Sequence, residues 1–281
     1  MIDINKEISY VSLKIDQLLE DFFLKNNCPS ENLLMAMKYS TIGSGKKFRP
    51  FLIYTIAKKL GIAEDVAFYV GMAIEMLHSY TLIHDDLPSM DNDDVRRGKP
   101  SSHIKFNEFT AILAGDALQT EAFYLLSSNE LKLDSAIKLQ IINLVAEVMG
   151  SRNLISGQML DLDFAKNNTP INVAIIEKIH ILKTAKLISL CTVLPSIIAD
   201  KDVDYQNKLA LYGEKLGIIY QIVDDMEDSG SNEPMNIVNI LGKAEAMQQL
   251  QELNSSSRAL LKELDLEDLT PINDYITKNI L

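Results

Sequence analysis

The spacing of apolar residues is the feature of this sequence that most constrains its fold. In residues 8–23, Val11, Ile15, Leu18 and Phe22 follow one another at steps of three and four residues, which places them on one face of an α-helix. Residues 136–150 repeat the pattern and end at Gly150, a residue type common at helix ends. No stretch alternates apolar and polar residues for long enough to predict a strand. The sequence therefore predicts an all-α protein, a single large bundle of about ten helices.

Length and composition favour one domain. The chain has 281 residues, 47% of them hydrophobic, and no proline- or glycine-rich linker divides it, so we predict a single domain over residues 1–281. The most apolar window, residues 66–83, contains Glu75 and His78, which a membrane-spanning helix tolerates poorly. We therefore predict a buried helix and no membrane span. The two cysteines show no metal-ligand spacing and the N-terminus does not resemble a secretory signal, which together predict a cytoplasmic protein.

The net charge of −12 argues against nucleic acid as a partner, because binding to the phosphate backbone needs a basic surface. An anionic small substrate would need local basic residues or a metal ion to offset the acidity of the chain.

The first concentrated charge follows the apolar window, in "HDDLPSMDNDDVRRGKPSSH" at 84–103. Asp85 and Asp86 stand at the predicted C-terminal end of the helix, where carboxylates oppose the helix macrodipole. An acidic run is usually a solvated surface, but this unfavourable placement points to an external cation. Monodentate carboxylates that leave room for phosphate oxygens and water suit Mg²⁺.

A second acidic cluster, "YQIVDDMED", also follows an apolar run near a predicted helix end. Gln221, Asp224, Asp225 and Asp228 can share one broad helix face, since Asp224 and Asp225 each lie three or four residues from both Gln221 and Asp228. Two such clusters, each closing a long apolar helix, predict a matched pair that holds metal between them.

Basic residues complement these acids. "GSGKKFRP" offers Lys46 and Arg49 beside glycines, where cations and backbone N–H groups can hold a phosphate, and Arg96 follows the first acidic cluster. Lys183 lies in an apolar helix, where an ammonium needs a partner. We interpret Lys47 and Lys186 as surface charges or as lysines whose stems cover apolar surface.

In this order the motifs resemble those of the trans-isoprenyl diphosphate synthases, the polyprenyl synthetase family, and most of all its bacterial farnesyl diphosphate synthases. The resemblance runs over about two thirds of the chain, and its ordered set of motifs is highly specific. The motifs are "GKKFRP", the two aspartate-rich motifs quoted above, "LAGDALQ" at 113–119, "GQMLDL" at 157–162 and "KTAKLI" at 183–188.

The resemblance implies an isoprenoid synthase-type bundle with a central apolar cavity, a homodimer, and about three Mg²⁺ ions per loaded site. It implies that isopentenyl diphosphate is held by Lys46, Arg49, His78 and Arg97. The metal would be held most directly by Asp85, Asp91 and Asp224, with Asp86, Asp225 and Asp228 as supporting or partial ligands. The residues in contact with the allylic diphosphate would be Arg96, Lys183, Thr184 and Gln221.

The resemblance also bears on the product. Tyr80 stands five residues before Asp85, where a bulky ring limits product growth in this family, although a tyrosine in such a helix is more often a plain core residue. We predict synthesis of (2E,6E)-farnesyl diphosphate from dimethylallyl or geranyl diphosphate, with a C20 or C10 product as the alternatives. A terpene cyclase of the same fold is disfavoured by the complete basic loop, which a cyclase would not need.

One departure from the family pattern follows the second aspartate motif. The family carries a loop there that ends in a lysine in contact with diphosphate, whereas Pro234 stands at about that position here and Lys243 lies further along. Loss of one charge-assisted contact costs roughly 1.5–3 kcal/mol. The departure keeps open a third hypothesis, a catalytically impaired partner subunit that binds diphosphate.

Overall fold

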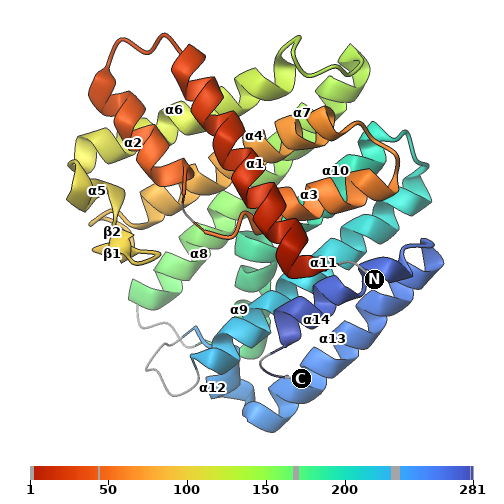
Figure 1. The fold of residues 1–281 in the computed structure, drawn as a ribbon. Coiled ribbons are helices and arrows are strands. Elements are labelled where there is room, and N and C mark those ends of the chain that lie inside the picture. The colour runs from red at the N-terminus through yellow and green to blue at the C-terminus, as the bar shows by residue number, and fades with distance from the viewer. Residues whose placement is uncertain (1–2, 44, 167–170, 229–234, 279, 281) are drawn as a thin grey trace. The chain divides into compact units, whose positions relative to one another are not determined.

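The structure, a computed structural model, describes residues 3–43, 45–166, 171–228, 235–278 and 280 (Figure 1). Helices make up nearly all of its regular structure, so the prediction of an all-α protein is confirmed. The chain divides into two compact units, each described below by itself. The N-terminal unit covers Asn5–Ile142, and the C-terminal unit covers Asn143–Leu281 together with Met1–Ile4. The prediction of one domain stays a prediction.

In the N-terminal unit, α4 packs against α6, α3 and α2. Helix α4 is buried from Val66 to Thr81 on nearly every side, which explains why its sequence is apolar all round rather than on one stripe. The elements of this unit, including the start of α7, are α1 (Ile4–Lys25), α2 (Glu31–Thr41), α3 (Phe48–Lys59), α4 (Glu64–Asp85), β1 (Val95–Arg96), β2 (Lys99–Pro100), α5 (Ser102–Lys105), α6 (Glu108–Ser127) and α7 (Ser135–Met149).

In the C-terminal unit, α11 is the central helix, because α10, α13, α14 and a π-helix all pack against it. Its long apolar run places Tyr212, Leu216 and Ile219 in contact with these neighbours, with none of the three exposed. The elements are α8 (Leu154–Lys166), α9 (Val173–His180), the π-helix η1 (Ile181–Ala185), α10 (Lys186–Ile198), α11 (Val203–Glu227), α12 (Ile237–Leu241), α13 (Lys243–Glu263), the 3₁₀ helix η2 (Glu267–Leu269) and α14 (Pro271–Thr277).

Two helical stretches, Glu64–Asp85 and Val173–Ile198, are long and apolar enough to cross a membrane by length and composition alone. Their most apolar windows are 89% and 67% buried, respectively, inside the protein. Burial of that extent is what core helices of a globular protein show, so these two helices are weak evidence for a membrane span.

A two-stranded antiparallel hairpin follows the first aspartate motif, and the sequence did not predict it. Arg96 pairs with Lys99, so Arg97 and Gly98 alone form the turn. Both have positive φ, 53° and 73°, which is the backbone of a type I′ hairpin turn. An arginine in this region is uncommon, and such positions are often found at functional sites.

Candidate active site

The N-terminal unit brings three of the predicted isopentenyl diphosphate residues together around one imidazole. Nε2 of His78 on α4 lies 3.0 Å from Nη1 of Arg49 on α3 and 3.1 Å from Nη2 of Arg97 in the hairpin turn. A guanidinium can only donate, so the imidazole nitrogen accepts from both. His78 therefore orients two cations that are far apart in the sequence.

The charge state of His78 fits this role. Burial, together with the nearby guanidinium groups of Arg49 and Arg97, lowers its pKa well below the ordinary value of 6.5. A neutral ring with its proton on Nδ1 leaves Nε2 free to accept, and it adds no positive charge that would repel the two arginines.

Gly45 of the basic loop leaves space for the side chain of Arg97. A Cβ atom on Gly45 would lie 2.5 Å from Cζ of Arg97, closer than any real contact. Gly45 also has a φ of +69°, a conformation that other residues rarely adopt. Lys46, the next residue, is exposed at the same end of the loop. Arg49, His78 and Arg97 are thus in contact with one another, and the assignment of these three residues and Lys46 to isopentenyl diphosphate stays a prediction.

The interpretation of Lys47 as a surface charge is wrong. Its side chain is fully buried, and Nζ lies 3.1 Å from Oε1 of Glu75, which is itself buried. The aliphatic part of a lysine side chain can pack against apolar residues while its ammonium reaches solvent. Here the ammonium is buried as well, because a carboxylate compensates its charge. Lys186 is different: it pairs with Glu214 at 2.5 Å and keeps about a third of its side chain exposed.

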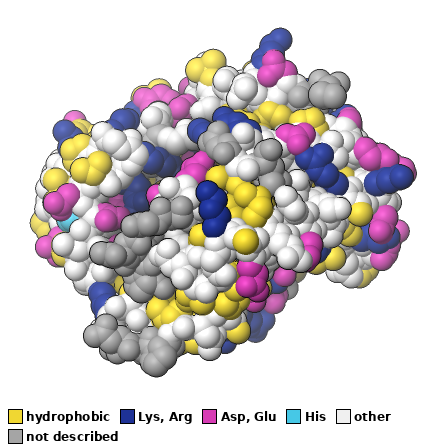
Figure 2. Space-filling model, turned by 90° about the horizontal axis from the view of Figure 1, so that it is seen from below, with side chains coloured by type: hydrophobic (Ala, Val, Ile, Leu, Met, Phe, Trp, Pro, Cys, Tyr) yellow, Lys and Arg dark blue, Asp and Glu magenta, His cyan; other side chains and the backbone are white. Residues whose placement is uncertain are grey.

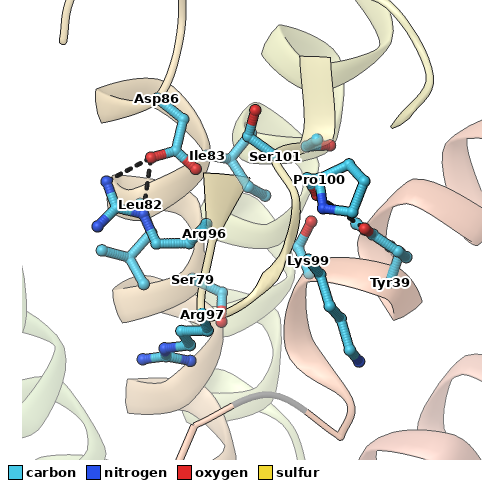
Figure 3. A pocket seen from close by; sticks show the side chains of 12 residues that line it. Tyr39, Ser79, Leu82, Ile83, Asp86, Arg96, Arg97, Lys99, Pro100 and Ser101 are labelled. Carbon is cyan, nitrogen blue, oxygen red and sulfur yellow. Dashed lines mark hydrogen bonds and ion pairs between the residues drawn. The ribbon is translucent and has the colours of Figure 1, made fainter. Parts of the chain in front are cut away.

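The first aspartate motif is divided between a buried and an accessible part. Asp86 is 2% exposed and accepts from Nε and Nη2 of Arg96 at 2.8 and 2.5 Å (Figure 3). Asp93 accepts from the same guanidinium at 2.8 Å. Burial raises the pKa of Asp86, and the bonds from Arg96 oppose that rise. Asp86 thus anchors the hairpin to α4, and Figure 3 shows the side chain of Arg97 extending away from this pair.

Asp85 and Asp91 are the predicted direct metal ligands of this motif. They form its accessible part. Asp85 is half-buried at the end of α4 and Asp91 is exposed in the loop. The N–H of Asp91 donates to the carbonyl of Asp85 at 2.9 Å, and the N–H of Asp93 donates to the carbonyl of Asp86 at 3.2 Å. These two bonds fold the "LPSM" segment back onto the helix end, so that both aspartates belong to one tight loop.

A small cavity lies beside the hairpin, between α2, α4 and the two strands (Figure 3). Tyr39, Ser79 and Leu82 line it together with the pair of Asp86 and Arg96. The hydroxyl of Tyr39 donates to the carbonyl of Pro100 at 2.7 Å, which closes one wall.

Tyr80 lies on the buried side of α4, with its side chain 3% exposed. Its ring meets the ring of His84 edge to face, with centroids 5.8 Å apart. Burial, helped by the carboxylate of Asp85, raises the pKa of Tyr80 to about 12, so the phenol stays neutral. Its position is compatible with both the core interpretation and the product-limiting one.

In the C-terminal unit, Lys183 and Thr184 lie in the π-helix η1 between α9 and α10. A π-helix widens one turn and is frequently found at functional sites. Two glycines allow neighbouring helices to approach it: a Cβ on Gly157 of α8 would lie 2.6 Å from the backbone nitrogen of Lys183, and one on Gly217 of α11 would lie 2.5 Å from Cα of Ala185. The glycine of the "GQMLDL" motif is thereby explained by close packing.

The sequence interpretation missed Asp161 as a site residue. Its carboxylate accepts from Nζ of Lys183 at 2.6 Å, and both side chains are partly exposed. This pair is the partner that an ammonium in an apolar helix requires. The signal was available, because Asp161 is the acidic residue of the quoted "GQMLDL" motif.

The second aspartate cluster also separates into exposed and buried side chains. Asp224 and Asp228 are exposed, and Gln221 is half-buried on the same helix. The N–H of Asp228, the C-cap of α11, donates to the carbonyl of Asp224 at 3.0 Å. Asp225 is buried and accepts from the backbone N–H of Ile237, at the start of α12, at 2.7 Å.

His180 lies on the other side of Asp225, with Nε2 at 3.8 Å from its carboxylate. Burial lowers the pKa of His180 to about 4. A neutral His180 adds no ion pair to the hydrogen bond that Asp225 accepts from the α12 N–H. Pro234, which stands where the family lysine is expected, falls outside the described residues, and Lys243 begins α13.

The donor sets suit Mg²⁺ in part. Within the described ranges no three acidic, thiol or imidazole side chains already gather as a metal centre. Asp85 with Asp91, and Asp224 with Asp228, each offer carboxylates at a solvent-facing helix end, the hard oxygen donors that Mg²⁺ prefers. Asp86 and Asp225 are engaged by Arg96 and by α12, which fits a supporting role better than direct coordination.

Comparison with known proteins decides the family. Residues 30–239 match the polyprenyl synthetase family. The chain belongs to the polyprenyl synthetase family. A farnesyl diphosphate synthase of Micrococcus luteus is 37% identical over 274 residues, which cover 92% of this chain and 91% of that protein. Geranylgeranyl pyrophosphate synthase 7 of Arabidopsis thaliana is 39% identical over 194 residues, 69% of this chain and 56% of that protein.

Among solved structures, an FPP/GFPP synthase from Zymomonas mobilis matches with a TM-score of 0.92 and 34% identity, and the match covers 98% of this chain and 99% of that one. The isoprenoid synthase fold predicted from the sequence is thus confirmed. As a member of the polyprenyl synthetase family, the chain is a short-chain trans-prenyltransferase.

Proposed function

We propose that this polyprenyl synthetase makes (2E,6E)-farnesyl diphosphate by condensing isopentenyl diphosphate with dimethylallyl and then geranyl diphosphate. The observation that carries the proposal is the cluster of Arg49, His78 and Arg97 around one neutral imidazole. This cluster offers a cationic site for one diphosphate, in addition to the acidic motifs that would bind another through Mg²⁺. An elongating enzyme needs two diphosphate sites, one of them for the homoallylic substrate. A cyclase needs only the site for the allylic substrate.

The basic cluster would hold isopentenyl diphosphate by direct charge-assisted contacts. Guanidinium groups bind phosphate oxygens in a fixed geometry, and the shared bond to His78 keeps Arg49 and Arg97 oriented before the substrate arrives. Lys46 would add a third cation. Preorganisation of this kind lowers the entropy lost on binding.

The allylic diphosphate would be contacted by Arg96, Lys183, Thr184 and Gln221. We assign direct metal binding to Asp85, Asp91 and Asp224, with supporting roles for Asp86, Asp225 and Asp228. When bound, Mg²⁺ would neutralise the diphosphate and so make it a better leaving group.

The reaction needs no side-chain nucleophile. The allylic carbon–oxygen bond breaks with its electron pair leaving on the diphosphate, and the π electrons of isopentenyl diphosphate form the new carbon–carbon bond to the allylic cation. A proton then leaves the neighbouring carbon of the adduct for the released diphosphate. Lys183 would stabilise negative charge where it develops on that diphosphate, and the predicted apolar cavity would exclude water from the cation.

The product length is the finer part of the proposal. Tyr80, five residues before Asp85 and buried, would end the channel at a C15 chain. A C20 product is the alternative, supported by the likeness to a geranylgeranyl pyrophosphate synthase, and a C10 product remains the third.

We further propose a homodimer, within a cytoplasmic and soluble single-domain protein. One face of α6 supports it, because Phe109 and Leu113 are 67% and 53% exposed, and Tyr124 further along the helix is 62% exposed. Apolar side chains gathered on one helix face commonly mark an interface. Light scattering coupled to size-exclusion chromatography would give the mass in solution, and a monomer at micromolar concentration would contradict this part.

The deciding experiment incubates purified protein with Mg²⁺, isopentenyl diphosphate and either dimethylallyl or geranyl diphosphate, and separates the products by chain length. A C15 diphosphate supports the proposal. A C20 or C10 diphosphate would change the proposed product length but not the proposed reaction. Release of a cyclic hydrocarbon from geranyl diphosphate in the absence of isopentenyl diphosphate would identify a cyclase. If no condensation occurs at any Mg²⁺ concentration, the hypothesis of a catalytically impaired partner subunit is the one that remains.

A further inference from the structure

The side chain of Lys47 joins three helices at the start of a fourth. Its Nζ lies 3.1 Å from Oε1 of Glu75 on α4 and 3.5 Å from Oδ1 of Asp16 on α1, and it donates to the carbonyl of Thr41, the last residue of α2. Lys47 itself is the N-cap of α3. The ammonium thus donates two hydrogen bonds, to Thr41 and Glu75, and forms a longer ion pair with Asp16.

The backbone around Lys47 is held in an unusual conformation. Gly43, Gly45 and Lys47 have φ values of 64°, 69° and 50°, so three positions of this short loop lie in the left-handed region. Glycine adopts that region readily and lysine does not, so the contacts of its side chain must hold Lys47 there. Asp16 reinforces the loop from its other end, because its second oxygen accepts from the N–H of Gly43 at 3.0 Å.

The loop held in this way carries the diphosphate-binding side chains. Lys46 immediately precedes Lys47, and Arg49 follows in the first turn of α3, where it meets His78. Glu75 lies one turn before His78 on the same helix, so the anchor of Lys47 and the partner of Arg49 are fixed to one element.

We propose that Lys47 is a positioning residue for the isopentenyl diphosphate site, acting through a buried clamp with Asp16 and Glu75. It touches no substrate. It fixes the backbone from which Lys46 and Arg49 extend, and its loss would leave both cations present but no longer preorganised. The inference rests on the proposed function for the identity of the bound diphosphate, whereas the clamp itself does not depend on it.

The kinetic test compares Lys47→Met with the native enzyme. Methionine keeps an unbranched side chain one atom shorter than that of lysine and removes the charge. The KM for isopentenyl diphosphate should rise about tenfold, equal to 1.4 kcal/mol, while the KM for geranyl diphosphate and kcat stay within a factor of about two. Lys47→Arg, which keeps a cation, should recover part of the loss. The proposal would be overturned if Lys47→Met changed the KM values for isopentenyl and geranyl diphosphate equally, or left the KM for isopentenyl diphosphate unchanged.

The matched control is Lys38→Met. Lys38 lies in the same unit, and its partly exposed ammonium is paired with Glu20 of α1 at 2.5 Å, outside the clamp of Asp16 and Glu75. Its KM values should equal those of the native enzyme. If Lys47→Met fails to fold because Glu75 is left buried without its cation, Asp16→Ala takes its place. That variant removes the hydrogen bond from Gly43 and the ion pair with Lys47 at the edge of the clamp, and it should raise the same KM by a smaller factor.

Hydrogen exchange tests the clamp without any substrate. The backbone amides of Gly45–Phe48 should exchange faster in Lys47→Met or Asp16→Ala than in the native protein, and those of α6 should not. Native rates throughout the loop would refute the clamp, whatever reaction the enzyme performs. Faster loop exchange in a protein that makes no prenyl product would support the clamp and refute only the proposed function.

Discussion

Nη1 of Arg49 lies 3.0 Å from Nε2 of His78, in a contact that only a neutral imidazole can accept. Arg97 makes the second such contact at 3.1 Å. One uncharged ring therefore holds two cations that would otherwise repel each other, at the place where we propose that a diphosphate binds.

Removal of the acceptor at position 78 should weaken binding of isopentenyl diphosphate. We expect His78→Leu to raise its KM about tenfold, the effect of losing contacts that orient charged groups. His78→Gln, whose amide oxygen can accept from the same guanidiniums, should lose less. Steady-state kinetics with each substrate varied in turn measures both. Equal effects of leucine and glutamine would show that the acceptor atom is not what matters.

The lowered pKa of His78 also makes stability depend on pH. The unfolded chain takes up a proton near pH 6.5, but the folded protein does so only at much lower pH, so the free energy of unfolding decreases as pH falls below about 6.5. Between pH 8 and pH 5 the free energy of unfolding should therefore fall more in the native protein than in His78→Gln. Urea unfolding at both pH values measures this difference. Parallel losses in the two proteins would contradict the buried, neutral state of His78.

Substitution of Gly45 should displace Arg97. In Gly45→Ala the new methyl group would lie 2.5 Å from the guanidinium carbon, and we expect the KM for isopentenyl diphosphate to rise about tenfold. Gly61→Ala is the matched control, since Gly61 has a similar φ of +72° but nothing within 4 Å of the added atom. Both variants carry the same backbone strain, so melting temperatures should fall alike while only Gly45→Ala changes the KM. A normal KM for Gly45→Ala would show that Arg97 can move without cost.

Truncation of Tyr80 should lengthen the product. Tyr80→Ala removes a buried ring below the first aspartate motif, and we expect C20 and longer diphosphates to appear beside or in place of C15. Chromatography of the dephosphorylated products measures their length. Tyr80→Phe, which keeps the ring, should give the native product. An unchanged product from Tyr80→Ala would leave Tyr80 as a core residue only.

Asp85 and Asp86 are neighbours with different expected effects. Asp86→Ala leaves Arg96 without its buried partner and should lower the free energy of unfolding by about 2–3 kcal/mol. Asp85→Ala removes a proposed metal ligand at the end of α4, so the Mg²⁺ concentration needed for activity should increase. Chemical unfolding and Mg²⁺ titration of activity separate the two. A destabilised Asp85→Ala with native Mg²⁺ dependence would reverse the assignment.

The local features of this protein could be predicted from its sequence, and the reason is physical. Helical periodicity is visible in residues that lie close together in the sequence, as in the series from Val11 to Phe22, and it does not depend on the rest of the fold. The sequence also named Arg49, His78 and Arg97 together, because they stand in motifs whose order is specific to the family, and the structure brings these three into contact.

Pairings between distant residues could not be predicted in the same way. The burial of Lys47 depends on Glu75 and Asp16 meeting it from two other helices, and nothing next to Lys47 in the sequence indicates that. Likewise, Asp225 looks like its neighbour Asp224 in the sequence, but it becomes engaged because α12 begins beside it. The hairpin escaped prediction because its strands have two residues each, too few for a periodic pattern.

The π-helix at Ile181–Ala185 has a consequence for how the chain tolerates insertions and deletions. Such a turn accommodates one residue more than an α-helical turn and keeps the helix after it nearly in phase with the helix before it. Removal of one residue from this turn should therefore restore a continuous α-helix with α10 close to its present phase, whereas removal of one residue from α10 itself, before Ser189, would rotate the rest of that helix by about 100°. Ser189 and Thr192, which donate to the carbonyls of Ala210 and Leu209 on α11, would then leave the face they now occupy. A one-residue deletion should thus be tolerated in the π-turn and not in the α-helical turn that follows it.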